Sequence, residues 1–144
     1  MLDIIDWKIV AALQENGRIT YSEIARQVNL TSPAVAERVR KLEDARIITG
    51  YHVAVNHERL GYPIVCFVHL AMPPEAENQF IDFVQGRPEV LECFVTTGQN
   101  AFILKVVAPS VSALNLLLNE FIAFGQPTTY IVLSEIFSHR TIKR

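Results

Sequence analysis

Residues 18–46 of this chain, RITYSEIARQVNLTSPAVAERVRKLEDAR, decide the fold of its N-terminal part. Apolar residues recur at helical spacing in two short runs, which are Ile24, Ala25 and Val28, and then Val35, Val39 and Leu42. Only residues 29–31 separate the two runs, which leaves room for a sharp turn and nothing more. The stretch therefore predicts a helix-turn-helix whose second helix projects from the body of the fold.

The ends of these helices carry residues that suit capping. Ser22 is a candidate N-cap of the first helix, and Thr31 or Ser32 of the second, where Pro33 stands at a position that needs no backbone N–H. Upstream, Asp3 with a second aspartate three residues later predicts the start of another helix. Three short helices are enough to close a small core.

The polar face of the second helix is asymmetric in charge. Small residues come first, at Ser32 and Ala34, and cations follow at Arg38, Arg40 and Lys41. This pattern suits a helix in the major groove of DNA, because its N-terminal end can approach base edges while the cations reach phosphates or guanine. A packed helical hairpin whose basic face is only solvated is the alternative interpretation of the same residues.

The segment after the helices changes character twice. Residues 47–55, IITGYHVAV, are rich in β-forming side chains, and we expect a small wing or a strand there. Asn, His, Glu, Arg, Gly and Pro then cluster in residues 56–63. We place the linker between two domains in that cluster.

The remaining residues predict the element order βαββαβ. We expect strands at 64–72, 90–97, 102–108 and 128–137, and helices at 75–86 and 110–123. This order is the ferredoxin-like arrangement, in which two helices cover one face of an antiparallel sheet. Val65, Phe67 and Ala71 alternate with other apolar residues, so both faces of the first strand are apolar. We expect a second copy of the chain to cover the open face.

Composition limits the classes of protein that remain. A chain of 144 residues of which 50% are hydrophobic can bury one or two small cores. Cys66 and Cys93 lie in apolar runs without a C-x-x-C pair, which predicts buried thiols and no metal site. The absence of a signal peptide or a membrane-spanning run favours the cytoplasm and no membrane partner.

The sequence carries no recognisable catalytic motif. His52, His57, His69 and His139 are scattered, and no nucleophile elbow, zinc-protease, P-loop or dinucleotide motif occurs. We place His69 at an interface between copies, and we expect neither an enzymatic activity nor a cofactor. The alternative is a ferredoxin-like ligand-binding or enzymatic oligomer whose helical head does not bind DNA.

Several motifs in register make the chain resemble the Lrp/AsnC, or feast/famine, transcription regulators. The matching residues are Leu2, Asp3, Ile5, Asp6, Asn16, Gly17, Arg18, Ile19, Ile24, Ala25, Glu37, Arg38, Val39, Arg40, Leu42, Glu43, Ile47, Ile48, Gly50, Tyr51, Leu60 and Gly61. The resemblance implies an α+β protein with a winged helix-turn-helix domain in residues 1–60, its helix-turn-helix at about 21–40. A ferredoxin-like βαββαβ (RAM) domain for effector binding and oligomerisation is expected in residues 61–144.

A protein of this kind is expected to be a sequence-specific transcriptional regulator of double-stranded promoter DNA. The first 60 residues carry as many Asp and Glu as Lys and Arg, so binding requires clustered cations and repeated heads. We expect a homodimer, and a tetramer or octamer beyond it, that places the second helix in the major groove. The expected DNA-binding residues are Arg26, Thr31, Ser32, Ala34, Glu37, Arg38, Arg40 and Lys41.

These residues divide by expected role. Ser32, Ala34, Glu37 and Arg38 are the candidates near base edges, while Arg40 and Lys41 hold phosphates, helped at the rim by Arg26 and Thr31. The Glu37 carboxylate accepts from cytosine N4 or orients a neighbouring cation, and the sequence favours the second use.

The resemblance also implies an effector site in the loop between the second and third strands. Its residues are Thr97, Gly98, Gln99, Asn100 and Ala101, of which Gly98 permits the backbone to approach a carboxylate. Many amino-acid-sensing relatives carry an acidic residue where Ala101 stands, and its loss removes about 1.5 to 3 kcal/mol of charge-assisted hydrogen bonding to an α-ammonium group. Three possibilities stay open: an altered ligand, an amino acid held by backbone groups with Gln99 or Asn100, or no effector.

Overall fold

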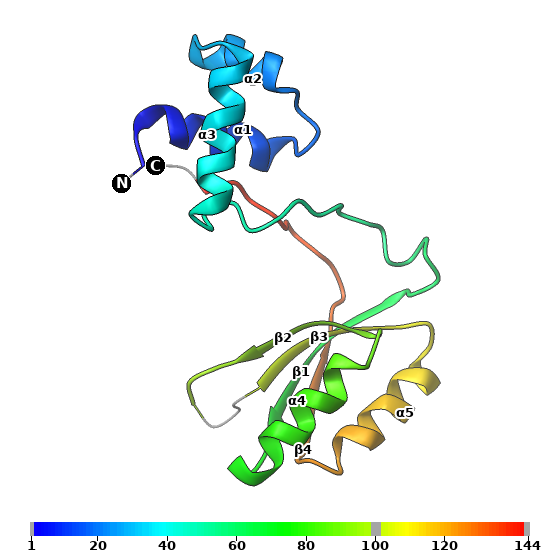
Figure 1. Ribbon diagram of the computed structural model, residues 1–144. Helices are drawn as coiled ribbons and strands as arrows, with labels where there is room; N and C mark the ends of the chain where they lie inside the picture. Colours follow the sequence, from blue (N-terminus) through cyan, green and yellow to red (C-terminus); the bar gives the residue numbers. More distant parts are fainter. Residues whose placement is uncertain (1, 99–101, 143–144) are drawn as a thin grey trace. The chain divides into compact units, whose positions relative to one another are not determined.

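The computed structural model describes residues 2–98 and 102–142 and divides the chain into two compact units (Figure 1). The first unit, here called the head, contains the described residues up to Ala54 and those from Phe137 onward; the second, here called the sheet domain, is Val55–Ile136. The expected division after residue 60 differs from this grouping. Residues 137–142 belong with the helices, because the Ile142 N–H donates to Gln14 Oε1 at 3.1 Å.

The head contains the three helices that the sequence predicts. They are α1 (Ile4–Glu15), α2 (Tyr21–Val28) and α3 (Ser32–Asp44). All three contribute to one apolar core, whose buried members are Ile9, Ala12, Ile24, Ala25, Val28, Val35, Val39 and Leu42. The periodic apolar residues of α2 and α3 are therefore the inward faces, and the polar residues between them face outward.

Two capping boxes start α1 and α2. Asp3 and Asp6 form the first, as the sequence predicts. The second is made by Thr20 and Glu23, so the prediction that Ser22 caps α2 was wrong. Ser22 already lies inside the first turn of α2, where its hydroxyl cannot accept from the N–H groups that a cap satisfies.

The turn between α2 and α3 depends on one residue. Asn29 ends α2 with φ 55° and ψ 47°, in the left-handed region that asparagine tolerates better than most side chains. Thr31 then caps α3, because its hydroxyl accepts from the Ala34 N–H at 3.4 Å, and Pro33 stands in the first turn. The chain thus reverses direction within the three predicted residues.

The predicted wing is not formed. Residues 47–55 contain no strand, and they pair with no strand among the described residues. Val53 is consequently 86% exposed. The Tyr51 hydroxyl holds the start of the segment to α3 by donating to Glu43 Oε1 at 2.9 Å, and burial raises the Tyr51 pKa to about 12.

The sheet domain has the predicted ferredoxin-like order. Its elements are β1 (Ile64–Ala71), the short 3-10 helix η1 (Pro74–Ala76), α4 (Glu77–Gln85), β2 (Val90–Val95), β3 (Phe102–Ala108), α5 (Val111–Phe121) and β4 (Gln126–Ile131). The strands pair antiparallel in the order β2-β3-β1-β4. Figure 1 shows α4 and α5 on the same face of this sheet.

The last strand is shorter than predicted. It ends at Ile131, whereas the apolar pattern continues to Phe137. The strand stops because its partner β1 begins at Ile64, so the ladder runs out after the Val132 N–H donates to the Val65 carbonyl at 2.8 Å.

The two faces of the sheet differ in burial. The helix-covered face holds a core centred on Phe80, which is fully buried and lies 5.3 to 5.6 Å from the rings of Phe102, Phe121 and Phe124. Cys66 lies in this core, where burial raises its pKa to about 11. Cys93 is exposed, so the prediction that both thiols are buried was wrong for this residue, which lies on the edge strand β2.

The opposite face of the sheet, here called the open face, has no covering layer within the described residues. Pairing aligns Phe67 with Tyr130 and Phe94 with Ile103, so these apolar side chains alternate with the buried ones. Phe67 is 38% exposed, Phe94 51% and Tyr130 55%. His69 also lies on this face, with its ring 5.0 Å from that of Tyr130.

Candidate nucleic-acid interface

The structure places seven of the eight expected DNA-binding residues on α3 or at its cap. Six lie along the helix and Thr31 caps it, whereas Arg26 lies in the last turn of α2. The Arg26 side chain is exposed and its Nε donates to the Ser22 carbonyl at 3.4 Å. The three-helix core thus presents one continuous polar surface on α3.

The first turn of α3 is the least charged part of this surface. Ser32 and Ala34 are half-buried, and no acidic residue stands in that turn. The N-terminal end of a helix also carries the positive end of its dipole and free N–H groups. Small side chains at such an end allow the backbone of α3 to come close to an anionic partner.

Glu37 and Lys41 form an ion pair one turn apart. Lys41 Nζ lies 2.7 Å from Glu37 Oε1, and both side chains are mostly exposed. The hydrogen bond from Lys41 lowers the Glu37 pKa below its ordinary value. The contact present in the structure is therefore the orienting one of the two uses that the sequence allows for Glu37.

Arg38, which the sequence places on the outward face of its helix, is engaged by two acidic side chains and is 31% exposed. Its Nη1 lies 2.7 Å from Asp3 Oδ2 and 2.6 Å from Asp6 Oδ1, at the start of α1. These hydrogen bonds raise the Arg38 pKa, and the Asp3 pKa is lowered first by the Asp6 backbone N–H and then by Arg38. Arg38 is thus engaged by two carboxylates that sequence reasoning did not connect with it, since they lie 35 and 32 positions away.

Arg40 is in a different situation. It is exposed on the outward side of α3, and within residues 2–98 and 102–142 no ion pair to it is recorded. Arg40 is therefore the guanidinium of α3 that is available to an external anion.

A hollow of about 620 Å³ runs along one side of α3. Its lining is Leu2, Asp6, Leu30, Ala34, Glu37, Arg38, Lys41, Leu42, Ala45 and Ile47. Asp6 and Arg38 both line it, whereas Arg40 is not among its lining residues.

The expected effector loop is described only in part. Thr97 and Gly98 follow β2, and Gly98 has φ 108°, a conformation that side chains with a Cβ rarely adopt. Gln99, Asn100 and Ala101 lie outside the described residues. The backbone freedom expected of Gly98 is therefore in use in the structure.

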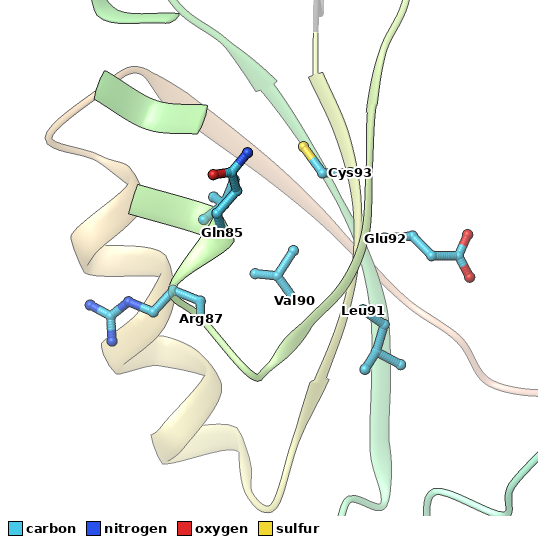
Figure 2. Close-up of a pocket in the computed structure, with 7 residues that line it drawn as sticks. Gln85, Arg87, Val90, Leu91, Glu92 and Cys93 are labelled. Atoms are coloured by element: carbon cyan, nitrogen blue, oxygen red, sulfur yellow. The ribbon is translucent and has the colours of Figure 1, made fainter. Parts of the chain in front are cut away.

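A second, shallow hollow of about 180 Å³ lies between α4 and β2. Figure 2 shows Gln85, Val90 and Cys93 on one side of β2, while Glu92 points to the other side. Arg87, the cation of the lining, is paired with Glu120 of α5, and Glu92 points away, so the lining offers no polar clamp for a charged ligand.

The described residues show neither a metal cluster nor a membrane-spanning helix. In the part of the chain that the structure describes, no three His, Cys, Asp or Glu side chains are grouped to hold a metal ion. The helices in the same residues are too short or too polar to cross a membrane.

Comparison with known proteins places this geometry in a family. Residues 2–43 match the model of the AsnC-type helix-turn-helix domain, and residues 65–142 match that of the Lrp/AsnC ligand binding domain. The chain is 38% identical over 138 residues to the HTH-type transcriptional regulator YezC of Bacillus subtilis (strain 168), which covers 96% of this chain and 98% of that protein. It is 33% identical over 142 residues to the leucine-responsive regulatory protein of Escherichia coli (strain K12), covering 94% of this chain and 87% of that protein.

Solved structures agree over the whole length. LrpC of Bacillus subtilis superposes with a TM-score of 0.90 at 31% identity, covering 96% of this chain and 99% of that one. A transcriptional regulator of Neisseria meningitidis in complex with L-methionine superposes with a TM-score of 0.91 at 28% identity, covering 99% and 96%. The relatives are regulators rather than enzymes, which sets aside the enzymatic alternative. The chain belongs to the Lrp/AsnC family of helix-turn-helix transcriptional regulators.

Proposed function

We propose that this regulator binds promoter DNA as a symmetric multimer, with α3 of each head in the major groove. The observation that carries the proposal is the outward surface of α3, on which small residues precede an exposed, unpaired Arg40. In a dimer of such heads, the two half-sites lie about one helical turn of DNA apart.

The residues of α3 divide into two groups in this proposal. Ser32 and Ala34 approach base edges at the N-terminal end of the helix, where no acidic side chain in the first turn repels phosphates. Arg40 and Lys41 hold phosphates, and Glu37 orients Lys41 through the ion pair described above. Arg26 and Thr31 assist at the rim.

The open face provides the contact between copies. Phe67, Phe94 and Tyr130 leave apolar surface in water, and among the described residues of this face the ion pair is Lys105 with Glu92, at 3.5 Å. A second sheet that packs against the open face buries these rings and leaves the two heads free to bind DNA together. Repeated heads raise the effective concentration of each at the DNA, so weak single contacts add up to useful affinity.

The proposed effector site is the loop of residues 97–101. The family-model match, the leucine-responsive name of the Escherichia coli relative and the L-methionine complex from Neisseria meningitidis all favour an amino acid as the ligand class. Because Ala101 supplies no carboxylate, the ligand is held here by backbone groups with Gln99 or Asn100. The site of action is the cytoplasm, where promoter DNA lies. Leucine and methionine at millimolar concentration should raise the melting temperature, and no shift with either would argue against this assignment.

A DNA titration tests the proposal. A duplex that the purified protein selects from a random pool is titrated at several salt concentrations with Arg40→Ala and, as a control, with Lys8→Ala, an exposed cation on α1 of the same head. We expect Arg40→Ala to weaken binding and to lower the salt slope by about one per bound head, while Lys8→Ala leaves both unchanged. Equal behaviour of the two variants would show that α3 is not the binding surface.

A further inference from the structure

We infer that Arg38 is a positioning residue: it fixes α3 against the start of α1 and does not itself contact DNA. The inference rests on the proposed binding of DNA by α3. Arg38 was expected to contact base edges, and the inference assigns it instead to holding in place the helix that contacts them.

Arg38 binds the capping box that Asp3 and Asp6 form at the start of α1. Asp3 Oδ1 accepts from the Asp6 N–H at 2.8 Å, and Asp6 Oδ2 accepts from the Asp3 N–H at 3.0 Å. The remaining oxygens, Asp3 Oδ2 and Asp6 Oδ1, both accept from Arg38 Nη1. The four carboxylate oxygens thus have four hydrogen bonds, and each aspartate uses one oxygen for α1 and one for α3.

The capping box of α2 has no corresponding hydrogen bond to another helix among the described residues. Glu23 Oε2 accepts from both the Thr20 N–H, at 2.8 Å, and the Thr20 hydroxyl, at 2.7 Å. No hydrogen bond from another helix to Glu23 is recorded among the described residues. Two boxes of the same type in one head therefore differ in one respect, which is that the first is joined to α3.

Without the Arg38 contacts, α3 would lose a restraint on its rotation about the helix axis. Apart from these contacts, α3 packs on α1 and α2 through the apolar side chains of Val35, Val39 and Leu42, and apolar packing fixes distance better than rotation about the helix axis. Charge-assisted hydrogen bonds have narrow distance and angle requirements. The Arg38 contacts therefore restrict the rotation that decides which side chains of α3 face the groove.

A direct contact between Arg38 and DNA would be costly. To reach a base or a phosphate, Arg38 would have to leave Asp3 and Asp6, whose two negative charges would then stand unneutralised on the same side of the head as the polyanion. The Asp6 side chain is 17% exposed and the Arg38 side chain 31%, so breaking the contact would also leave a largely covered carboxylate without its cation. Both effects oppose a direct contact.

A double-mutant cycle tests the inference on the full chain. The variants are Arg38→Ala, Asp6→Asn and the double variant, with Glu23→Gln in the unlinked capping box as the control. Each is titrated with the selected duplex and with a random duplex across a salt series. We expect either single substitution to reduce the ratio of specific to random affinity by about tenfold, the double substitution to add little more, and the salt slope to stay unchanged.

Two outcomes of this cycle would contradict the positioning role of Arg38. If Arg38→Ala lowers the salt slope by about one per head while Asp6→Asn binds like the wild type, Arg38 contacts DNA directly. A role in folding alone is recognised by a fall in melting temperature with an unchanged ratio of specific to random affinity, which is the result expected for Glu23→Gln.

A measurement without DNA separates this inference from the proposed function. Amide hydrogen exchange in α3 of the free protein should be faster in Arg38→Ala and in Asp6→Asn alike, and unchanged in Glu23→Gln. If the wild type binds no duplex, the proposed function fails while this measurement still decides whether Arg38 fixes α3. Unchanged exchange in both variants would refute the positioning role.

Discussion

The outward surface of α3 in the head and the open face of the sheet domain differ in chemical character. In the head, charges find partners within the same chain, as the Arg38 contacts and the Glu37–Lys41 pair show. In the sheet domain, aromatic rings such as Phe94 remain exposed on a face that no described residue covers. The head thus closes its core with its own three helices, whereas the open face of the sheet domain is the surface that we propose a second copy covers.

The largest effect should come from the covered face of the sheet. Phe80→Ala removes a fully buried ring that contacts three other aromatic rings, and we expect it to lower the free energy of unfolding by about 3 to 5 kcal/mol. Phe94→Ala on the open face should cost a monomer far less. Urea unfolding below the concentration at which copies associate measures both, and equal losses would mean that the two faces do not differ.

Charge on the open face should break the assembly rather than the fold. Phe67→Glu places a carboxylate at the centre of the proposed contact, where its desolvation should weaken self-association by about a hundredfold or more. Val111→Glu is the control, because Val111 is 66% exposed at the start of α5, away from the strands. Sedimentation velocity over a concentration series gives the result, and a Phe67→Glu protein that remains dimeric would exclude the open face as the interface.

The capping residue of α2 offers a smaller effect inside the head. Thr20→Ala removes the acceptor for the Glu23 N–H and half of the capping box, so we expect a loss of about 1 kcal/mol in the free energy of unfolding. Ser22→Ala, two residues later, should change it by less than about 0.5 kcal/mol. If chemical denaturation shows a larger loss in the free energy of unfolding for Ser22→Ala than for Thr20→Ala, Ser22 is the cap.

The smallest effect should be on the stability of the head at acid pH, where two capping carboxylates with lowered pKa values become protonated. The Asp3 pKa lies below its ordinary value of 3.8 and that of Glu23 below 4.5. Each group therefore stabilises the head above its ordinary pKa, and this contribution is lost as the pH falls through the lowered value. In melting curves between pH 6 and 3, Asp3→Asn and Glu23→Gln should flatten the decline relative to the wild type. Parallel curves for all three proteins would exclude this origin.

Local patterns in the sequence predicted most of the fold. Helical spacing gave the inward faces of α2 and α3, and the alternation in β1 gave its two faces, because both follow from the geometry of a single element. The capping box at Asp3 was equally local. Such features depend on residues within four positions of one another.

The errors at residues 47–55 and in the last strand concern long-range partners, whereas the Ser22 error is local, because the true cap Thr20 lies two residues away. The apolar residues 47–55 have strand character, but a strand also requires a neighbour, which this segment lacks. The last strand ended early for the same reason, at the point where β1 begins. The contacts of Arg38 with Asp3 and Asp6 also escaped sequence analysis, because helical spacing shows only which residues are polar and these partners lie more than thirty positions away.

The path of the chain, which passes twice between its units, has a practical consequence for anyone who wishes to study the head alone. A fragment cut at residue 60 would lack the segment after Phe137 and with it the hydrogen bond to Gln14. A better isolated head would replace residues 55–136 with a short flexible bridge, so that both pieces of the unit stay on one polypeptide. The unit that holds the helices is therefore discontinuous in the sequence, with the sheet domain between its two segments.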